Sequence, residues 1–285
     1  MRAENKAPKT ITTYLAAVET LATYLRSVGR DDLTTLDRND LRRWIEHMQS
    51  KGASAATVSL RFRAVRQFVK WCAAEEEIAT DVMAGMTAPA VPIVPVAVLS
   101  DDELSALLKA CSGRDFMALR DTAIIRLLLD TGMRRGELLG LGVDDVDVMA
   151  GLVTVFGKGR RYRTLKYGSK TRAAMDRYKR RRCAHRLADL SAFWLPERGS
   201  VALSEDALRS ILRRRGEAAG IGSIHTHQFR HTFAADYLDS GGNETDLMRA
   251  AGWRSRQMVD RYGAAVADDR ARAARDRLVT KADRL

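Results

Sequence analysis

The sequence has few cysteines and no long apolar run. Its three cysteines, Cys72, Cys111 and Cys183, are widely spaced and odd in number. They fit neither a disulfide framework nor a metal-binding pair, so we interpret them as reduced packing residues. No apolar stretch approaches the roughly 20 residues of a membrane-spanning helix, and the N-terminus MRAENKAPKT lacks the apolar core of a signal peptide. We therefore expect a cytoplasmic protein with no membrane partner.

Internal repeats and low-complexity tracts are also missing, and prolines are scarce outside one segment. Three of the five prolines fall between Ala88 and Val98, in APAVPIVPVAV. Proline removes a backbone donor and disfavours a helix before it, so this segment is expected to be a semi-extended linker. The sequence thus predicts one domain over 1–88, a linker over 89–97 and a second domain over 98–285.

Acidic residues are too few to balance the basic ones. Lys and Arg number 48 against 36 Asp and Glu, which gives a formal charge of +12. Such a charge concentrates polyanions at the protein surface, and nucleic acid is the first candidate. Between Gly157 and Arg182, twelve Lys or Arg residues face one acid, Asp176. This density, on an expected hairpin and the helix after it, suits a groove that follows phosphates.

Apolar residues at helical spacing predict three helices in the first domain. The first begins near Ile11 and ends at Gly29, the second follows the cap candidate Asp37 and ends at Gly52, and the third follows Ser54. The first helix is expected to bury an apolar stripe made of Tyr14, Leu15, Val18, Leu21, Ala22 and Leu25.

The second domain opens with a capping box. In SDDE, Ser100 and Glu103 have the spacing that caps a helix start, and a longer apolar helix is expected from about Phe116 to the break at Thr131-Gly132. Between 145 and 168 the pattern changes to short β-rich runs, LVTVF and RYRTLKY. The fold class is therefore mainly α, with a small antiparallel sheet in the second domain.

Four short segments carry the residues best suited to chemistry. They are TGMRRGELLGL (131–141), GKGRRYR (157–163), HQFRHTFA (227–234) and AGWRSRQMVDRYG (251–263). In this order, and over nearly the whole chain, they resemble the tyrosine recombinase family, also called phage-type integrases. The resemblance implies an N-terminal SAM-like domain that binds core DNA, followed by a catalytic domain. Because the first helix is expected soon after Met1, we also expect the compact form without an arm-binding domain.

The resemblance assigns a role to each matching residue. It implies six catalytic residues: Arg134, Lys158, His227, Arg230, Trp253 and Tyr262. It also implies two supporting residues, namely Glu137, which helps hold Arg134, and His231. Trp253 stands where most members carry histidine; an indole donates a hydrogen bond but cannot transfer a proton. Its role is therefore limited to phosphate positioning and ring packing.

These roles fit the chemistry of breaking a DNA phosphodiester. Displacement at phosphorus places negative charge on the non-bridging oxygens, which the guanidinium groups of Arg134 and Arg230 can hold. The leaving 5′ oxygen needs a proton, suited to Lys158, and the attacking phenol of Tyr262 must lose one to a base such as His227. The arginines do the electrostatic work of a metal ion, so we expect no metal and no cofactor.

Candidate DNA contacts lie in both domains. On the third helix of the first domain a basic stripe is either a solvated face or a DNA-binding surface. The candidates are Arg63, Arg66 and Lys70 on this helix, and Arg160, Arg161 and Arg163 on the hairpin. The resemblance implies double-stranded DNA with inverted half-sites as the substrate, and a homotetramer on two duplexes as the active assembly.

Other interpretations remain open. His225, His227 and His231 could be a zinc cluster, although no further ligand is obvious nearby. A DNA-binding regulator that has lost catalysis would have no use for the complete set of catalytic residues. Within the same chemistry, a Xer-type resolvase of chromosomes or plasmids is the alternative to an integrase of mobile elements, and a type IB topoisomerase would relax DNA without exchanging strands.

Overall fold

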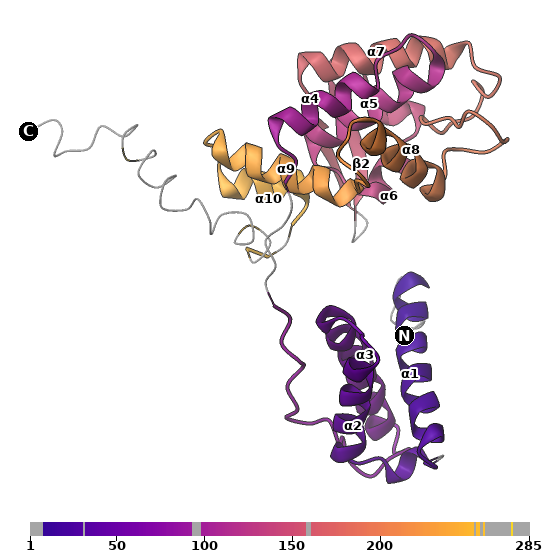
Figure 1. The fold of residues 1–285 in the computed structure, drawn as a ribbon, viewed down its shortest axis with the longest axis vertical. Coiled ribbons are helices and arrows are strands. Elements are labelled where there is room, and N and C mark those ends of the chain that lie inside the picture. The colour runs from indigo at the N-terminus through magenta and orange to yellow at the C-terminus, as the bar shows by residue number, and fades with distance from the viewer. Residues whose placement is uncertain are drawn as a thin grey trace, which may run out of the picture. The chain divides into compact units, whose positions relative to one another are not determined.

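The chain divides into two compact units, Met1–Val94 and Pro95–Leu285, each with its own apolar core (Figure 1). The division falls inside the expected linker 89–97. The computed structural model describes residues 8–30, 32–92, 98–157, 161–253, 255, 256, 259 and 275, without the side chains of Leu33 and Arg161. Among these described residues, no helix has both the length and the apolar character needed to cross a membrane.

The described residues of unit 1 form three α-helices and one short 3-10 helix. In chain order they are α1 (Pro8–Ser27), η1 (Leu33–Thr35), α2 (Arg38–Ser50) and α3 (Ala55–Ala74). The Asp37 side chain accepts hydrogen bonds from the first turn of α2, and the Ser54 side chain caps α3, because both are short polar side chains that satisfy free backbone donors. The three predicted helices are confirmed.

The core of unit 1 forms where the three helices meet. Leu21, Trp44 and Phe62, one from each helix, are buried there. Leu15 is an exception to the predicted stripe because its exposed fraction is 60%, while Ala17 points inward instead. The stripe of α1 is therefore rotated slightly from the one that apolar spacing alone suggests.

Unit 2 contains seven α-helices and one three-stranded sheet among its described residues. The helices are α4 (Asp101–Ala110), α5 (Phe116–Thr131), α6 (Arg135–Leu139), α7 (Ser169–Cys183), α8 (Glu205–Ala218), α9 (Thr226–Asp239) and α10 (Glu244–Ala251), with a short 3-10 helix η2 (Val143–Asp145) before the sheet. The predicted capping box at Ser100 and Glu103 starts α4, and α5 ends at Gly132 in the left-handed conformation. Both sequence predictions are confirmed.

The sheet is antiparallel, with strands β1 (Val146–Asp147), β2 (Leu152–Gly157) and β3 (Arg161–Lys166) in chain order. Val153, Val155 and Leu165 face the core of unit 2. On the other face, Phe156 and Tyr162 form an exposed cross-strand pair. The mainly helical fold with a small antiparallel sheet is thus confirmed.

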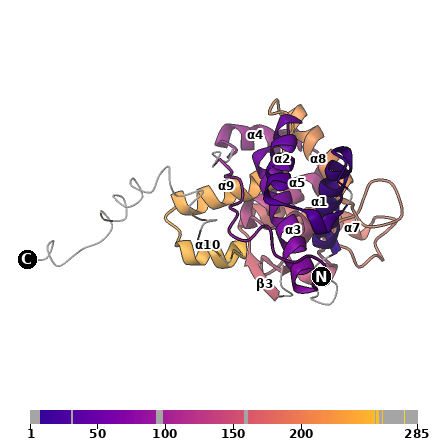
Figure 2. The ribbon, with the colours of Figure 1, turned by 90° about the horizontal axis from the view of Figure 1, so that it is seen from below.

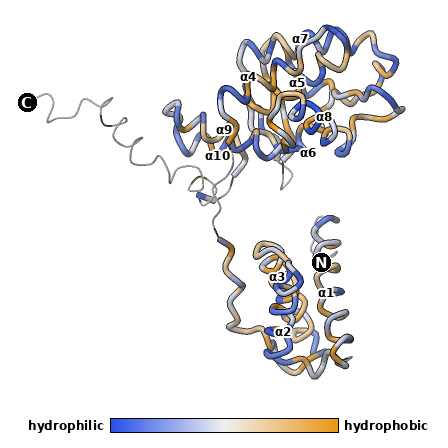
Figure 3. Tube along the Cα trace, in the orientation of Figure 1, coloured by the Kyte–Doolittle hydropathy of each residue, from blue (hydrophilic) through white to orange (hydrophobic). Residues whose placement is uncertain are grey.

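One face of this sheet packs on the core of unit 2, and α6 contacts β2. Helix α5 contacts both α7 and α9, and α9 lies beside α10 (Figure 2). Along the helices of both units, hydrophilic and hydrophobic stretches alternate, as expected for elements that bury one side only (Figure 3). Figure 1 shows α7 on the opposite side of unit 2 from α6 and α10.

Candidate active site

Arg134 lies at the start of α6, immediately after the turn that ends α5. Its backbone amide donates to Glu137 Oε2 at 2.7 Å, and its Nη1 donates to Glu137 Oε1 at 2.9 Å. Glu137 therefore caps the first turn of α6 with one carboxylate oxygen and holds the Arg134 side chain with the other. The Arg134 side chain keeps an exposed fraction of 34%, so it is held in place but remains accessible.

Arg163 of β3 binds the same carboxylate. Its Nη1 and Nη2 donate to the two oxygens of Glu137, each at 2.8 Å, in a paired geometry. Burial alone would raise the pKa of the Glu137 carboxyl, but the hydrogen bonds from Arg163 and Arg134 outweigh burial, and the pKa is lowered. Glu137 is thus a charged, buried acid shared by two arginines.

Three arginines hold the C-terminal end of α10. Ala250 O accepts from Arg163 Nε at 2.9 Å, Ala251 O accepts from Arg230 Nη2, and Gly252 O accepts from Arg134 Nη2 at 2.8 Å. The last carbonyls of a helix have no partners within the helix and carry its negative dipole end. The guanidinium groups satisfy them, and so fix the point where the chain leaves α10 toward Trp253.

Gly252 is required at this end for two reasons. Its φ of +62° lies in the left-handed region. A Cβ atom there would also lie 3.2 Å from Arg163 Nη1 and 3.3 Å from Arg134 Nη1, closer than most real contacts of a Cβ. A side chain at this position would therefore require the two arginines that share Glu137 to move by a few tenths of an ångström.

Arg230, on α9, is nearly fully buried and connects α5 with α10. Its Nη1 donates to Gly132 O at 2.6 Å, and its guanidinium carbon lies 5.2 Å from the centre of the Trp253 ring. A cation at this distance from an indole face is attracted to it. Trp253 is buried beside this guanidinium, and its role in the reaction stays a prediction.

His227 lies in the first turn of α9, one turn before His231. The two rings are nearly perpendicular, with centroids 5.1 Å apart. Burial lowers the pKa of His227 below its ordinary value, and the positive charges of Arg230, Arg134 and Arg135 lower it further. The imidazole is therefore neutral near pH 7 and able to accept a proton.

The structure thus brings together six of the residues that the sequence singled out. They are Arg134, Glu137, His227, Arg230, His231 and Trp253, from α6, α9 and the residue that follows the α10 cap. Lys158, Arg160 and Tyr262 lie outside the described residues, as does the side chain of Arg161. Their roles stay predictions.

Two of the candidate DNA contacts have a different environment from the one we expected. Arg163 is mostly buried and directs all three guanidinium nitrogens to Glu137 and Ala250. Arg66 in unit 1 donates to Met86 O and stacks over Phe62. We therefore reassign both residues to contacts within their own units, whereas Arg63 and Lys70 are exposed as expected.

The basic helix after the hairpin lies away from the candidate active site. We expected its cations to continue a groove from the hairpin. Exposed cations of α7 include Lys170, Arg177, Lys179 and Arg181, but α7 packs on α5 on the side of unit 2 opposite α6 and α10 (Figure 1). Helix α7 therefore does not lie beside α6 and α10, and the groove expected over the hairpin and this helix stays a prediction.

The position of Arg163 was missed although the sequence carries a signal for it. Side chains alternate between the two faces of a strand, and Leu165, two residues later, faces the core. Arg163 therefore shares the inward face. The carbonyls of α10 left no comparable sequence signal, because a backbone acceptor carries no residue identity. Within the described ranges, no group of three or more His, Cys, Asp or Glu side chains is arranged to hold a metal ion.

Comparison with known proteins adds to this geometry. Residues 97–268 match the model of the "Phage integrase family", and residues 1–76 match that of the "Phage integrase, N-terminal SAM-like domain". The chain is 31% identical to "Tyrosine recombinase XerD" of Corynebacterium glutamicum over 271 residues, which covers 91% of this chain and 88% of the relative.

Two solved structures illustrate the likeness of fold. A XerH site-specific recombinase bound to palindromic difH substrate, in a post-cleavage complex, has a TM-score of 0.76 at 20% identity; the match covers 95% of this chain and 81% of that one. A lambda integrase tetramer bound to a Holliday junction has a TM-score of 0.69 at 18% identity, with coverage of 89% and 74%.

Proposed function

This chain belongs to the phage integrase family, and from that premise we propose that it is a site-specific DNA recombinase that works through a covalent 3′-phosphotyrosine at Tyr262. The strongest structural support is the array in which two arginines, Arg134 and Arg230, are fixed against one helix end with a neutral histidine beside them. Preorganised cations of this kind stabilise the charge that develops during phosphoryl transfer.

The proposed step balances without a cofactor. The Tyr262 oxygen forms a bond to phosphorus as the bond from phosphorus to the 5′ oxygen breaks. The phenolic proton passes to His227, and Lys158 supplies a proton to the departing 5′ oxygen. A 5′ hydroxyl of a second strand then attacks the phosphotyrosine and releases Tyr262. Each step exchanges one phosphoester for another, so no external energy source is needed.

Arg134 and Arg230 bind the non-bridging oxygens in this proposal. Both are planar donors, and Arg230 is desolvated, which strengthens its attraction to an anion. Trp253 packs against Arg230 and keeps its guanidinium plane fixed. Burial lowers the pKa of His227, and the cations that bind the phosphate lower it further, so the same charges contribute to electrostatic stabilisation and to proton acceptance.

We further propose that the active assembly is a homotetramer on two duplexes, each with inverted half-sites, acting on DNA in the cytoplasm. The tetrameric lambda integrase complex supports this assembly by analogy of fold. The exchanged DNA belongs to a mobile element that is integrated or excised. Similarity to a protein named XerD favours a second candidate, the resolution of chromosomes or plasmids by the same reaction.

The chemistry is tested by covalent capture on a library of duplexes with a randomised core. Wild-type protein should form an adduct that survives a denaturing gel, in excess EDTA as well, while Tyr262→Phe should bind the recovered DNA normally and form none. An adduct formed equally by the phenylalanine variant, or a requirement for metal, contradicts the proposal. Mapping the recovered sequence to the end of a mobile element or to a single chromosomal locus separates the two candidates.

A further inference from the structure

We propose that Arg163 is a positioning residue that fixes Arg134 and the end of α10 relative to each other, from the strand that follows Lys158. This inference rests on the proposed function, because it gives Arg163 a role in preparing the same site. Arg163 is five residues beyond Lys158 on the hairpin, and its side chain reaches two other elements, α6 through Glu137 and α10 through Ala250.

The shared carboxylate is the first reason. Glu137 Oε1 accepts from Nη1 of both Arg134 and Arg163, and Oε2 accepts from the Arg134 backbone amide and from Arg163 Nη2. Arg163 occupies the paired geometry, so Arg134 is limited to a single side-chain contact with this acid. Without Arg163, the carboxylate would be free to form a paired bridge with Arg134. That bridge would turn the guanidinium away from its present orientation.

The end of α10 is the second reason. Arg163 Nε holds Ala250 O while Arg134 Nη2 holds Gly252 O. These carbonyls are two residues apart, and both arginines approach Gly252 closely. The two arginines therefore set the position and rotation of the helix end together. The chain continues from this end to Trp253, which packs against Arg230, so a shift here would move a second phosphate-binding group.

A positioning role and a direct phosphate contact predict different effects of a mutation on affinity and on rate. A cation that binds phosphate contributes to affinity and to salt dependence, and its loss reduces the salt slope by about one unit. A cation that orients another group leaves binding intact and lowers the rate of the chemical step, and misplacement of a reacting group by about 1 Å can cost about a hundredfold. Arg163 has only 17% of its side chain exposed, which favours the second behaviour.

The test uses full-length protein and the duplex recovered by covalent capture. Arg163→Met keeps the length of the side chain and removes its charge and hydrogen bonds. We expect single-turnover adduct formation to slow by roughly a hundredfold, with unchanged dissociation constant and salt slope. Arg163→Lys should recover only part of the rate, because lysine cannot donate in a paired geometry. Lys166→Met, on the same strand and exposed, is the matched charge control and should cleave at the wild-type rate.

A double-mutant cycle separates action through Glu137 from an independent effect. If Arg163 acts through this acid, Glu137→Gln combined with Arg163→Met should be little slower than the slower single variant. Fully additive losses, a reduced salt slope or an unchanged rate in Arg163→Met would each overturn the proposal.

Should the methionine variant fail to fold, Arg163→Lys carries the same test, with a lower rate at unchanged affinity as the expected result. A wild-type adduct together with an unchanged Arg163→Met rate overturns this inference alone, whereas absence of any wild-type adduct contradicts the proposed function.

Discussion

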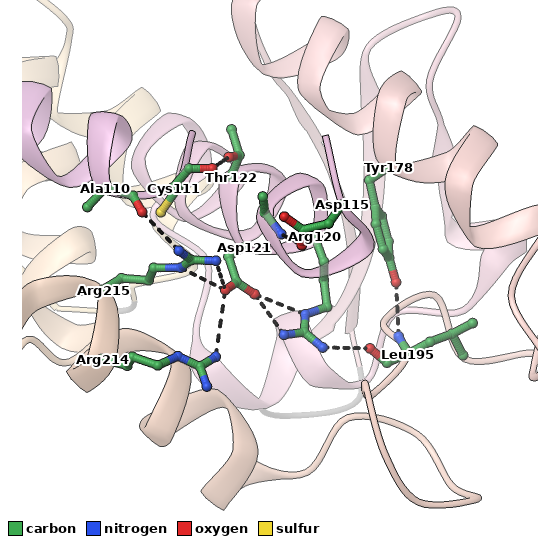
Figure 4. Close-up of polar contacts among 11 residues, drawn as sticks. Ala110, Cys111, Asp115, Arg120, Asp121, Thr122, Tyr178, Leu195, Arg214 and Arg215 are labelled. Atoms are coloured by element: carbon green, nitrogen blue, oxygen red, sulfur yellow. Dashed lines mark hydrogen bonds and ion pairs between the residues drawn. The ribbon is translucent and has the colours of Figure 1, made fainter. Parts of the chain in front are cut away.

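In the described part of unit 2, two networks are alike in kind, because each places arginines around one buried acid. Glu137 is shared by Arg134 and Arg163 in the candidate active site. Asp121 is shared by Arg120 and Arg215 in the core, with Arg214 at 3.9 Å (Figure 4). Both acids have side chains with almost no exposure. The two networks differ in the other groups that their arginines contact and in how exposed those arginines are.

The Asp121 network joins elements of the fold. Arg120 binds one carboxylate oxygen through Nε and Nη2 and donates from Nη1 to Leu195 O, while Arg215 binds the other oxygen and donates to Ala110 O (Figure 4). It thereby ties α5 to α8, to the end of α4 and to the segment around Leu195. Arg120 is as buried as the acid, with 3% of its side chain exposed.

The Glu137 network ends at the last carbonyls of α10, and its Arg134 keeps an accessible side chain. The comparison teaches that an arginine-carboxylate cluster indicates function only through its surroundings. When the arginines that donate hydrogen bonds to the acid also donate to carbonyls of the core, as Arg120 and Arg215 do, the cluster is part of the scaffold. When one cation remains reachable beside a helix end and a neutral histidine, the cluster is prepared for an anion.

The largest expected effect separates the two networks by stability. Asp121→Asn removes the charge that compensates Arg120 and Arg215 in the core, and breaking a buried pair in this way costs about 3–5 kcal/mol of unfolding free energy. Urea denaturation of the full chain would measure the loss. Below the unfolding transition, single-turnover cleavage should stay near wild type. A cleavage defect without a stability defect would mean that this network belongs to the active site.

The next largest effect distinguishes the two networks by the rate of DNA cleavage. Arg134→Lys should raise the barrier to cleavage by about 2–4 kcal/mol, comparable to the loss of one preorganised donor, because lysine lacks the planar fork. Covalent adduct formation against time measures it. Arg214→Lys is the matched control, since Arg214 is more than half exposed at the edge of the Asp121 network, and its rate should not change. Normal cleavage by Arg134→Lys would remove Arg134 from the catalytic set.

Much of this fold could be predicted from local sequence. The capping box at Ser100 and the break at Gly132 each depend on a few adjacent residues, and both were confirmed. The residues of the array were found through short motifs, and the structure brings Arg134, His227 and Arg230 together.

The rest depends on contacts between distant segments. Arg120 and Asp121 are neighbours in sequence and resemble ordinary solvated charges, and only the packing of α8 makes them buried. The charge of Arg163 alone suggests a surface cation, whereas its place in the strand alternation turns the side chain inward. The three acceptors at the end of α10 are backbone oxygens, so no residue type in the sequence marks them.

The smallest expected effect compares one histidine from each region. Burial lowers the pKa of both His227 and His185 below the ordinary value of 6.5, with further lowering by Arg230, Arg134 and Arg135 for the first and by Arg186, Arg120 and Arg182 for the second. Each folded-state pKa lies below the unfolded one. The stability that each neutral imidazole contributes is therefore present above pH 6.5 and is lost as pH falls through the folded-state value.

The rate of cleavage should depend on the protonation of His227 and not on that of His185. If it accepts the proton of Tyr262, wild-type protein at pH 6.5 should keep more than half of its plateau rate, because more than half of the imidazole is still neutral there. Below the folded-state pKa the rate should fall by about tenfold per pH unit.

His185→Gln should reproduce this profile, since His185 stacks on Phe116 beside Arg120, within the scaffold network. His227→Gln should be slow at every pH and should lose the acidic limb. Single-turnover rates between pH 5 and 8, at duplex concentrations well below the dissociation constant, make the measurement, because such rates report the pKa of the DNA-free protein. An acidic limb that persists in His227→Gln would assign the proton acceptor to another group and leave His227 only as a donor to the phosphate.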